Sequence, residues 1–541
     1  MIGLNHRRSP DIACPPILLV YTIFMTSSCP AADAAPHASA AQLASECHAA
    51  PANTGPGVLL NDIHSNLNAT RVANIARPAT IAELCAIVRA AAERGGSLSI
   101  GGARHAMGGQ QFRAGATHVD ITGLDRILSM DHTRGLLTAQ AGITWPTLIT
   151  GMHELQARES HSGRPFWSIR QKQTGADTLT LGGALSANIH GRGLRMRPII
   201  DDVERFTLVN PRGELVECSR ERNSELFRLA IGGYGLFGVI ATVTLRLMPR
   251  VAVRRRVQVT SIADAATDAR AAMNSASMFA DFQFEVDPMS LHFLTRGVFA
   301  RYELAGGEAD AVTNVELAPD DWRRLLLLAH TDKSRAFQEY ARHYLATDGQ
   351  TYWSDTHQLG VYLDNYHAEI DRATGAACRC SEMISELYVP PDRIADFLQA
   401  AQVTLRALQG DVIYGTVRLI HKDEESFLAW ARETFACVIF NLHVEHSPAG
   451  LEHAAACFRA LIDLALDRGG SFYLTYHRFA TREQLLRAYP QLPAFIAAKR
   501  RLDPAGVFDS EWWRWIAATV GTPARAETTQ GRAASPKAMS A

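Results

Sequence analysis

Residues 101–110 read GGARHAMGGQ, a loop with four glycines and one histidine. The loop follows a short apolar segment at 97–100 that predicts a β-strand. Because glycine has no Cβ, backbone N–H groups in such a loop can converge on an anion. His105 would then lie beside the bound group, as a nucleophile or as a ligand. The loop therefore predicts a strand followed by an anion-binding turn.

A chain of 541 residues with 47% hydrophobic and 20% charged residues has the composition of an ordinary globular protein. Its length predicts more than one domain, or one large domain with a second lobe. The formal net charge of −1 argues against a nucleic-acid partner and against a polybasic membrane-surface protein.

The N-terminus has the features of a secretory signal peptide. Basic residues at 6–8 precede an apolar run at 17–25, and residues 32–34 match an A-x-A cleavage site. We therefore expect a signal peptide over 1–34 and an exported protein, periplasmic or secreted; the alternative is an N-terminal extension that stays attached. No apolar stretch reaches the roughly 18 residues of a membrane span, so no transmembrane anchor is expected. Residues 35–69 are expected to form a linker.

The hydrophobic periodicity predicts an α+β fold in two parts. In the first part we expect helices at 80–95 and 224–231, strands at 117–121, 136–141 and 239–245, and a hairpin over 206–218. From about residue 255 the pattern changes, and we expect a second α+β lobe with a largely antiparallel sheet. Its expected strands are 281–286, 386–389, 412–420 and 437–444, and its expected helices are 320–344, 394–408 and 451–466. A further helix is expected at 478–500.

Two motifs suggest sites that their surroundings argue against. Residues 233–238 match G-x-G-x-x-G, but a dinucleotide-binding motif follows a strand and opens a helix, whereas this one follows a helical segment and precedes a strand. We therefore reject a Rossmann NAD site. His443, Glu445 and His446 could suggest a metal cluster, but two ligands at strand spacing are a weak signal. We interpret them as exposed polar residues at a strand end and predict no metal site.

Four segments occur in an order and at a spacing that resemble the vanillyl-alcohol oxidase superfamily of FAD enzymes. They are the glycine loop with His105, the segment 180–191, the turn at 235–240 and Asp503-Pro504. The resemblance covers roughly residues 70–250 and 410–515. It implies FAD as cofactor, a PCMH-type flavin domain of two α+β subdomains, a cap domain over the isoalloxazine, and a C-terminal segment that returns to the site.

On this basis we expect the flavin domain at 70–250, the cap at 251–470, the returning segment at 471–516 and a disordered tail at 517–541. The resemblance also assigns FAD-binding roles to residues of the loop, of the second segment and of the turn. These residues are Gly101, Gly102, Ala103, Arg104, His105, Ala106, Gln110, Thr180, Gly182, Gly183, Ser186, Asn188, Gly235, Gly238 and Ile240.

The loop around His105 resembles those of cytokinin dehydrogenases and alditol oxidases, in which the matching histidine is bonded to the flavin 8α-methyl group. We therefore expect FAD to be attached covalently through His105; the alternative is a histidine that only hydrogen-bonds within the loop. Berberine-bridge-type enzymes add a cysteine bond, but residues 174–181 contain no cysteine, so at most one covalent link is expected. Cytokinin dehydrogenases place a catalytic Asp five residues before the Thr of Thr-x-Gly-Gly, where this chain has Gly175.

The chain is more similar overall to decaprenylphosphoryl-ribose oxidases and to alditol and aldonolactone oxidoreductases. The segment that supplies their active-site lysine resembles residues 473–478, where Tyr476 replaces the lysine. Tyr476 and the adjacent His477 are the expected base or proton relay, and His190 is the next candidate. Arg418 and Asn441 are expected to orient the substrate.

These resemblances imply an FAD-dependent oxidoreductase, an oxidase or a dehydrogenase. It would transfer a hydride from a C–H bond of an alcohol, polyol, sugar or lactone to flavin N5. O₂ or another acceptor would then reoxidise the flavin. The alternatives are amine oxidation as in cytokinin dehydrogenases, a flavin-dependent reductase, and a non-catalytic flavoprotein.

Overall fold

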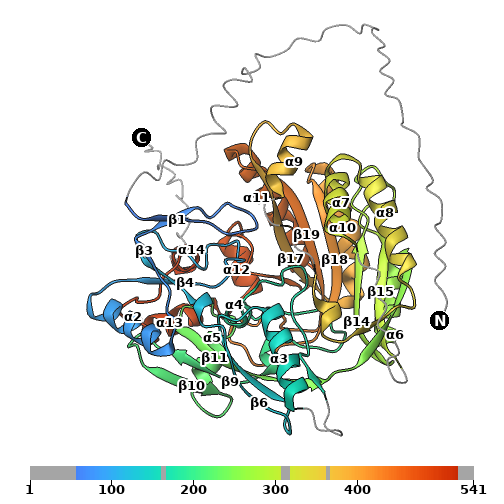
Figure 1. Ribbon diagram of the computed structural model, residues 1–541. Helices are drawn as coiled ribbons and strands as arrows, with labels where there is room; N and C mark the ends of the chain where they lie inside the picture. The colour runs from blue at the N-terminus through green and yellow to red at the C-terminus, as the bar shows by residue number, and fades with distance from the viewer. Residues whose placement is uncertain (1–55, 160–165, 306–316, 361–362, 364–365, 522–541) are drawn as a thin grey trace, which may run out of the picture.

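The computed structural model describes residues 56–521 except 160–165, 306–316, 361–362 and 364–365. Two lobes lie side by side: the flavin-domain segment, blue to green in Figure 1, and a cap built on one large sheet, green to orange. The expected signal peptide and the end of the expected tail lie outside the described residues. None of the helices in the described ranges combines the length and apolar character that a membrane span requires.

The first subdomain contains a parallel three-stranded sheet in the order β3-β5-β4. Its elements are β3 (Asn74–Ala76), α2 (Ile81–Glu93), β4 (Leu98–Gly101) and β5 (Thr117–Asp120). Helix α2 begins where Thr80 accepts a hydrogen bond from the Glu83 amide and the Glu83 carboxylate accepts one from the Ala79 amide. The expected helix and the strand before the glycine loop are confirmed.

Residues 56–69 are a correction to the expected linker. They include β1 (Val58–Leu60), which pairs with β2 (Thr70–Val72). The Asp62 carboxylate accepts hydrogen bonds from the Ser65 amide at 2.6 Å and from the Asn68 side chain at 3.0 Å. Asn68 also donates to the Met107 carbonyl at 2.6 Å, so this segment braces the glycine loop. Polar residues that bond their own backbone order a segment that composition alone suggests is free.

The second subdomain is an antiparallel sheet in the order β10-β9-β11-β7-β6. Its strands are β6 (Ile127–Asp131), β7 (Leu136–Gln140), β9 (Val203–Val209), β10 (Leu215–Ser219) and β11 (Val239–Arg246). Its helices are α3 (Trp145–Glu159), α4 (Leu181–Ala187) and α5 (Ser224–Ala230), and a short pair joins β8 (Trp167–Ser168) to β12 (Met248–Pro249). The G-x-G-x-x-G motif lies between α5 and β11, which confirms the reversed order.

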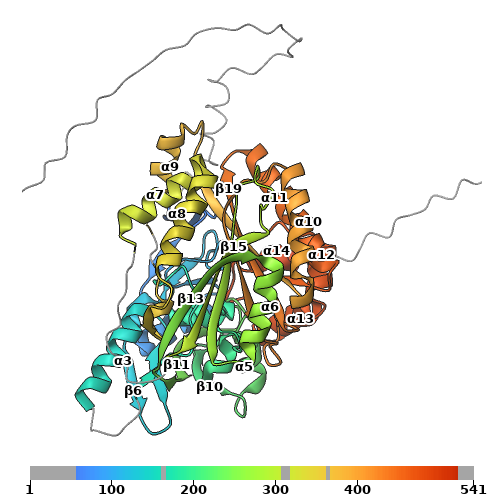
Figure 2. The same cartoon turned by 90° about the vertical axis from the view of Figure 1, so that its right-hand side faces the viewer.

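The cap is an eight-stranded antiparallel sheet in the order β16-β13-β15-β14-β18-β19-β17-β20. Its strands are β13 (Ala252–Ser261), β14 (Ser277–Phe284), β15 (Arg296–Leu304), β16 (Thr351–Trp353), β17 (Cys380–Val389), β18 (Val412–Ile420), β19 (Phe435–Glu445) and β20 (Ser471–Phe472). One face carries α6 (Ile262–Met273), α10 (Ile394–Ala407) and α11 (Pro448–Leu466). The other carries α7 (Pro319–Thr331), α8 (Lys333–Ala346) and α9 (His367–Thr374), and Figure 2 shows the two groups on opposite sides.

Two of the expected long helices are each broken in two. The helix expected at 320–344 is α7 and α8, because the backbone at Asp332 leaves the helical region and its carboxylate caps α8 by accepting from the Arg335 amide. The helix expected at 478–500 is α12 (Arg482–Ala488) and α13 (Leu492–Leu502). Tyr489 between them has φ −131° and ψ 73°, since the following Pro490 disfavours the helical conformation.

The C-terminal segment leaves the cap at β20 and returns to the flavin domain. The Leu98 amide of β4 donates to the Val507 carbonyl at 2.7 Å, and the Asp509 amide donates back to Leu98. Helix α14 (Glu511–Gly521) then buries Trp512, Ile516 and Val520. The disordered tail that we expected from 517 therefore cannot begin before 522.

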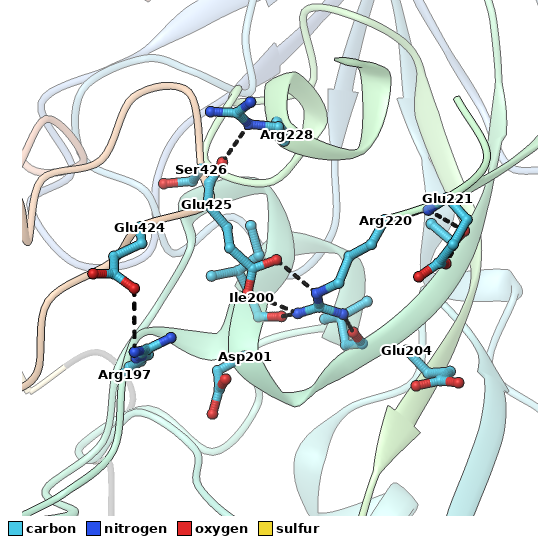
Figure 3. A network of polar contacts seen from close by, with 12 residues as sticks. Arg197, Ile200, Asp201, Glu204, Arg220, Glu221, Arg228, Glu424, Glu425 and Ser426 are labelled. Carbon is cyan, nitrogen blue, oxygen red and sulfur yellow. Dashed lines mark hydrogen bonds and ion pairs between the residues drawn. The ribbon is translucent and has the colours of Figure 1, made fainter. Parts of the chain in front are cut away.

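A polar junction fixes the loop between β18 and β19 to the flavin domain. Figure 3 shows Arg220 paired with Glu425, Arg228 donating to the Glu425 carbonyl, and Arg197 facing Glu424. The Arg220–Glu425 distance is 2.7 Å, and the guanidinium also donates to the carbonyls of Val203 and Ile200. This network holds one end of the cap against the flavin domain.

Candidate functional site

A cavity of about 860 Å³ lies between the flavin domain, the cap sheet and helices α7 and α8. Eighteen of the twenty residues predicted for the site line this cavity. They are Gly101, Gly102, Ala103, Arg104, His105, Ala106, Gln110, Thr180, Gly182, Gly183, Ser186, His190, Gly235, Gly238, Ile240, Arg418, Asn441 and Tyr476. Asn188 and His477 do not line it.

The glycine loop turns its backbone toward this cavity. Arg104 has φ 61°, a left-handed conformation that makes successive N–H groups converge. The amides of Ala103, Arg104 and Ala106 donate no hydrogen bond to any residue that the structure describes, although all three residues line the cavity. Three amides that lack an acceptor in the described chain, at the wall of one cavity, are donors that fit an anion held in the loop. A diphosphate such as that of FAD supplies the matching charge.

The loop also meets the start of α4 with no room for a side chain. A Cβ added to Gly102 would lie 2.2 Å from Thr180 Oγ1, and one added to Gly182 would lie 2.9 Å from Ala141 Cβ. Thr180 Oγ1 in turn accepts from the Gly183 amide at 3.2 Å. The two predicted glycine segments therefore form one bare-backbone surface, which suits close approach of a dinucleotide.

His105 is buried in the loop and has a neighbour on each ring nitrogen. Its Nδ1 lies 2.8 Å from His64 Nε2, and its Nε2 lies 2.9 Å from Thr178 Oγ1. Burial, together with the nearby His64 and Arg104, lowers the pKa of His105 to about 2. The imidazole is therefore neutral at physiological pH, the state in which a ring nitrogen has a lone pair.

Asn188 is a correction to the predicted FAD-binding set. It ends α4 with φ 50°, and its side-chain amide donates to Asp423 at 2.8 Å. Its carbonyl oxygen accepts from the Trp430 indole at 3.0 Å. Its neighbours face the cavity, but the left-handed turn directs Asn188 to the loop between β18 and β19, where it joins the two lobes.

His477 is the second correction. Its ring stacks on Phe458 with 4.6 Å between centroids, and its Nε2 lies 3.2 Å from Ser385 Oγ. Burial lowers the pKa of His477 to about 3. Consecutive side chains of this segment face different ways, so Tyr476 reaches the cavity and His477 packs in the core. His477 is therefore not positioned as a base.

Glu386 of β17 is the central polar group of the cavity, and the sequence analysis missed it. Its Oε1 lies 2.5 Å from His190 Nε2 and accepts from the Tyr388 hydroxyl at 2.5 Å. Its Oε2 accepts from the Tyr476 hydroxyl at 3.2 Å. Burial would raise the pKa of Glu386, but His190 and the hydroxyl donor lower it to about 2. Glu386 therefore connects the two predicted residues His190 and Tyr476.

The tautomer of His190 follows from its second contact. Its Nδ1 lies 2.9 Å from the Gly191 carbonyl oxygen, an acceptor, so Nδ1 carries a proton. A second proton must then lie between Nε2 and Glu386, which makes the pair a carboxylate and an imidazolium. Burial and the Glu386 charge raise the pKa of Tyr476 well above its usual value. Tyr476 thus stays protonated and can pass a proton only by exchange with Glu386.

Arg418 and Asn441 face the cavity from the neighbouring strands β18 and β19. The Arg418 side chain is buried, yet its guanidinium makes no hydrogen bond or ion pair with any described residue. The Asn441 side-chain oxygen is likewise buried without a hydrogen-bond partner among them. Buried polar groups of this kind are usually satisfied by a ligand or by water.

The motif His443–His446 differs from the exposed strand end that we expected. His443 Nδ1 lies 3.7 Å from the Glu382 carboxylate, and the His443 side chain is 21% exposed. His446 Nε2 lies 2.8 Å from Ser381 Oγ. Only Glu445 is exposed. The third group that the motif lacked in sequence, Glu382, comes from β17, which pairs with β19.

Residues 72–219 match the family model described as "FAD binding domain". The chain is 25% identical over 454 residues to the L-gulono-1,4-lactone dehydrogenase of Mycobacterium tuberculosis (strain ATCC 25618 / H37Rv), which covers 82% of this chain and 95% of that protein.

Two shorter matches fall on plant proteins. The mitochondrial L-galactono-1,4-lactone dehydrogenase of Arabidopsis thaliana is 31% identical over 204 residues, 36% of this chain and 30% of that protein. Cytokinin dehydrogenase 7 of Oryza sativa subsp. japonica is 30% identical over 178 residues, 32% of this chain and 33% of that protein. With the α+β fold and the glycine-lined cavity, these findings identify an FAD-dependent oxidoreductase with an FAD-binding domain at residues 72–219, and they support the resemblance to the PCMH-type, or vanillyl-alcohol oxidase, superfamily.

Proposed function

We propose that the chain oxidises a CH–OH group of a sugar lactone or a related polyol, with the hydride taken by FAD. The observation that carries the proposal is Arg418, a buried guanidinium at the cavity with no carboxylate bound to it. An Arg side chain without an ion-pair partner suits a ligand with a carbonyl or several hydroxyls. L-gulono-1,4-lactone and L-galactono-1,4-lactone, the substrates in the relatives' names, have both.

The side chains around Glu386 provide a route for the substrate hydroxyl proton. Bound FAD supplies the hydride acceptor. Tyr476 lines the cavity and accepts the substrate proton at its hydroxyl while its own proton moves to Glu386 Oε2. Before the transfer, His190 stabilises the negative charge of Glu386 at the other carboxylate oxygen. Arg418 and Asn441 orient the substrate oxygens, and the apolar residues of α7 and α8 exclude water.

The test is anaerobic reduction of the purified flavoprotein. We expect L-gulono-1,4-lactone or L-galactono-1,4-lactone to bleach the flavin band. Bleaching by a cytokinin-type amine instead would favour amine oxidation, and bleaching by NAD(P)H would favour a reductase. A flavin that none of these reduces would favour a non-catalytic flavoprotein.

An Arg418→Met variant should lose catalytic efficiency without losing FAD. Hydrogen bonds to a charged group contribute about 1.5–3 kcal/mol, so kcat/KM should fall roughly 10- to 100-fold. The flavin content and the unfolding temperature should not decrease, because removing an unpaired buried charge destabilises the fold little. Steady-state kinetics and thermal unfolding test this. Arg254→Met, at an exposed position of β13, is the control, and an unchanged kcat/KM for Arg418→Met would contradict the role of Arg418.

We also propose that FAD is bonded covalently through His105. The neutral, buried imidazole at the edge of the glycine loop supports this assignment. Acid-precipitated protein should remain yellow, whereas His105→Ala protein should release its flavin into the supernatant. His292→Ala, at an exposed position, should behave as the unmodified protein does. Release of flavin from the unmodified protein would mean that His105 only hydrogen-bonds.

Export is the third proposal. It rests on the basic, apolar and A-x-A segments of residues 1–34. Protein isolated from its native host should begin near residue 35 and be found outside the cytoplasm, as N-terminal sequencing of fractionated cells would measure. Active cytoplasmic protein that still begins at Met1 or Ile2 would contradict export and would leave the flavin assignment unaffected.

A further inference from the structure

Three imidazoles surround one buried carboxylate at the end of the cap sheet nearest α7 and α9. Glu382 comes from β17, His330 from the last turn of α7, His367 from the start of α9 and His443 from β19. His330 Nε2 lies 3.0 Å and His443 Nδ1 lies 3.7 Å from Glu382 Oε1. His367 Nδ1 lies 2.6 Å from Oε2. The proposed reaction uses none of these groups.

The three imidazole nitrogens lie at ion-pair distance from the Glu382 carboxylate, but outside hydrogen-bond geometry. His330 Nε2, His443 Nδ1 and His367 Nδ1 are buried and make no hydrogen bond to any described group, despite these short distances. The ligand atoms of His330, Glu382 and His443 all lie within 4.8 Å of one another, which is the spacing of ligands around one ion.

The other carboxylate oxygen is already occupied. The Tyr366 hydroxyl donates to Glu382 Oε2 at 2.6 Å. His367 Nε2 faces the His64 carbonyl oxygen at 2.9 Å and its Nδ1 faces Glu382 Oε2 at 2.6 Å, so both of its ring nitrogens already face acceptor oxygens. Groups that orient a ligating carboxylate in this way are typical of the surroundings of metal sites.

We propose that His330, Glu382 and His443 bind a divalent first-row transition-metal ion of the zinc type, with Tyr366 and His367 holding the other carboxylate oxygen. Imidazole nitrogen and carboxylate oxygen are ligands that zinc prefers. The ion would join α7, β17 and β19. Ala329, Tyr366 and His367 line the cavity next to these ligands, so the ion would fix the cavity wall.

A second cluster of similar composition is less suited to a metal. His190, Glu386 and Cys437 also lie within 4.8 Å of one another. There, however, Oε1 of Glu386 is already contacted by His190 at 2.5 Å, by the Tyr388 hydroxyl at 2.5 Å and by Cys437 Sγ at 3.3 Å. An ion at Glu386 Oε1 would have to displace one of these three contacts, so the Glu382 cluster is the metal site that we infer.

Equilibrium dialysis of the chelator-treated, flavin-loaded full chain against Zn²⁺ tests the proposal. We expect one zinc ion per chain and a higher unfolding temperature with zinc. His443→Ala and Glu382→Gln should each weaken binding by at least about 10-fold. His446→Ala, one residue beyond the end of β19 and next to Ser381, should retain the ion, as should Cys437→Ser. Flavin content reports whether each variant is folded.

X-ray absorption at the zinc edge of the unmodified protein gives an independent measurement. Nitrogen and oxygen neighbours with imidazole scattering are expected. A sulfur neighbour, or zinc lost in Cys437→Ser and kept in His443→Ala, would overturn the assignment in favour of the Glu386 cluster. Failure of the unmodified protein to bind one zinc ion would also overturn it, and the three imidazoles would then form a protonated ion-pair cluster with Glu382.

Discussion

Replacing Glu386 with glutamine should slow flavin reduction by roughly 10²- to 10⁴-fold, the usual cost of losing a positioned proton acceptor. Glutamine keeps the size of the side chain but cannot accept the proton that Tyr476 passes on. It also leaves the His190 imidazolium without its carboxylate at 2.5 Å. Anaerobic stopped-flow measurement with the lactone that reduces the unmodified protein gives this rate directly.

Two further variants make the Glu386 result specific. Tyr476→Phe should also slow reduction, because it removes the hydroxyl that donates to Glu386 Oε2. His477→Ala, one residue further along, should leave the reduction rate within a few-fold, because its ring lies in the core against Phe458. A Glu386→Gln protein that keeps its flavin and is reduced at the unmodified rate would show that the proton takes another route.

Asp503→Ala should destabilise the protein by about 3–5 kcal/mol, the usual cost of breaking a buried ion pair from one side. Asp503 is paired with the buried Lys499. Its two oxygens also accept from the amides of Val507 and Phe508, each at 2.9 Å. The variant leaves an unpaired ammonium and two unpaired amides in the core. The midpoint of urea unfolding, with flavin content as a second readout, measures the loss.

The matched control for Asp503 removes both charges. A Lys499→Met, Asp503→Asn double variant keeps a side-chain acceptor for the turn and leaves no buried charge, so it should be more stable than Asp503→Ala. If Asp503→Ala unfolds at the same urea concentration as the unmodified protein, the pair contributes nothing measurable to stability.

Local signals in the sequence were sufficient for the flavin domain. The strand before the glycine loop, the helix that begins after Thr80 and the hairpin at 206–218 were all predicted. Each of them depends on residues that are close together in the sequence. Breaks at Asp332 and Tyr489 were missed, since the apolar periodicity continues across them. The ordering of residues 56–69 depends on Asp62 and Asn68 side chains whose role composition does not reveal.

The site was harder to predict because its partners are distant in the chain. Glu386 contacts His190, which is 196 residues earlier, and no short motif records that proximity. One signal was available: Glu382 and Glu386 are the two charged residues of their strand and lie four residues apart, so they share a face. The predicted strand covered only residues 386–389, so Glu382 lay outside it and the two glutamates were not recognised as a pair. Tyr476 and His477 were both predicted as the base or proton relay, although only Tyr476 faces the cavity and His477 packs in the core.

The return of the C-terminal segment determines when this protein can fold. Gln110, at the end of the glycine loop, donates to the Leu474 carbonyl 364 residues later, and Leu98 of β4 bonds Val507. A nascent chain leaves the ribosome from its N-terminus, and most domains fold as they emerge. Here the first strand–loop unit cannot be completed until nearly all of the described chain has been synthesised. Cofactor capture therefore follows translation, and a truncated nascent chain should contain a glycine loop that does not retain FAD.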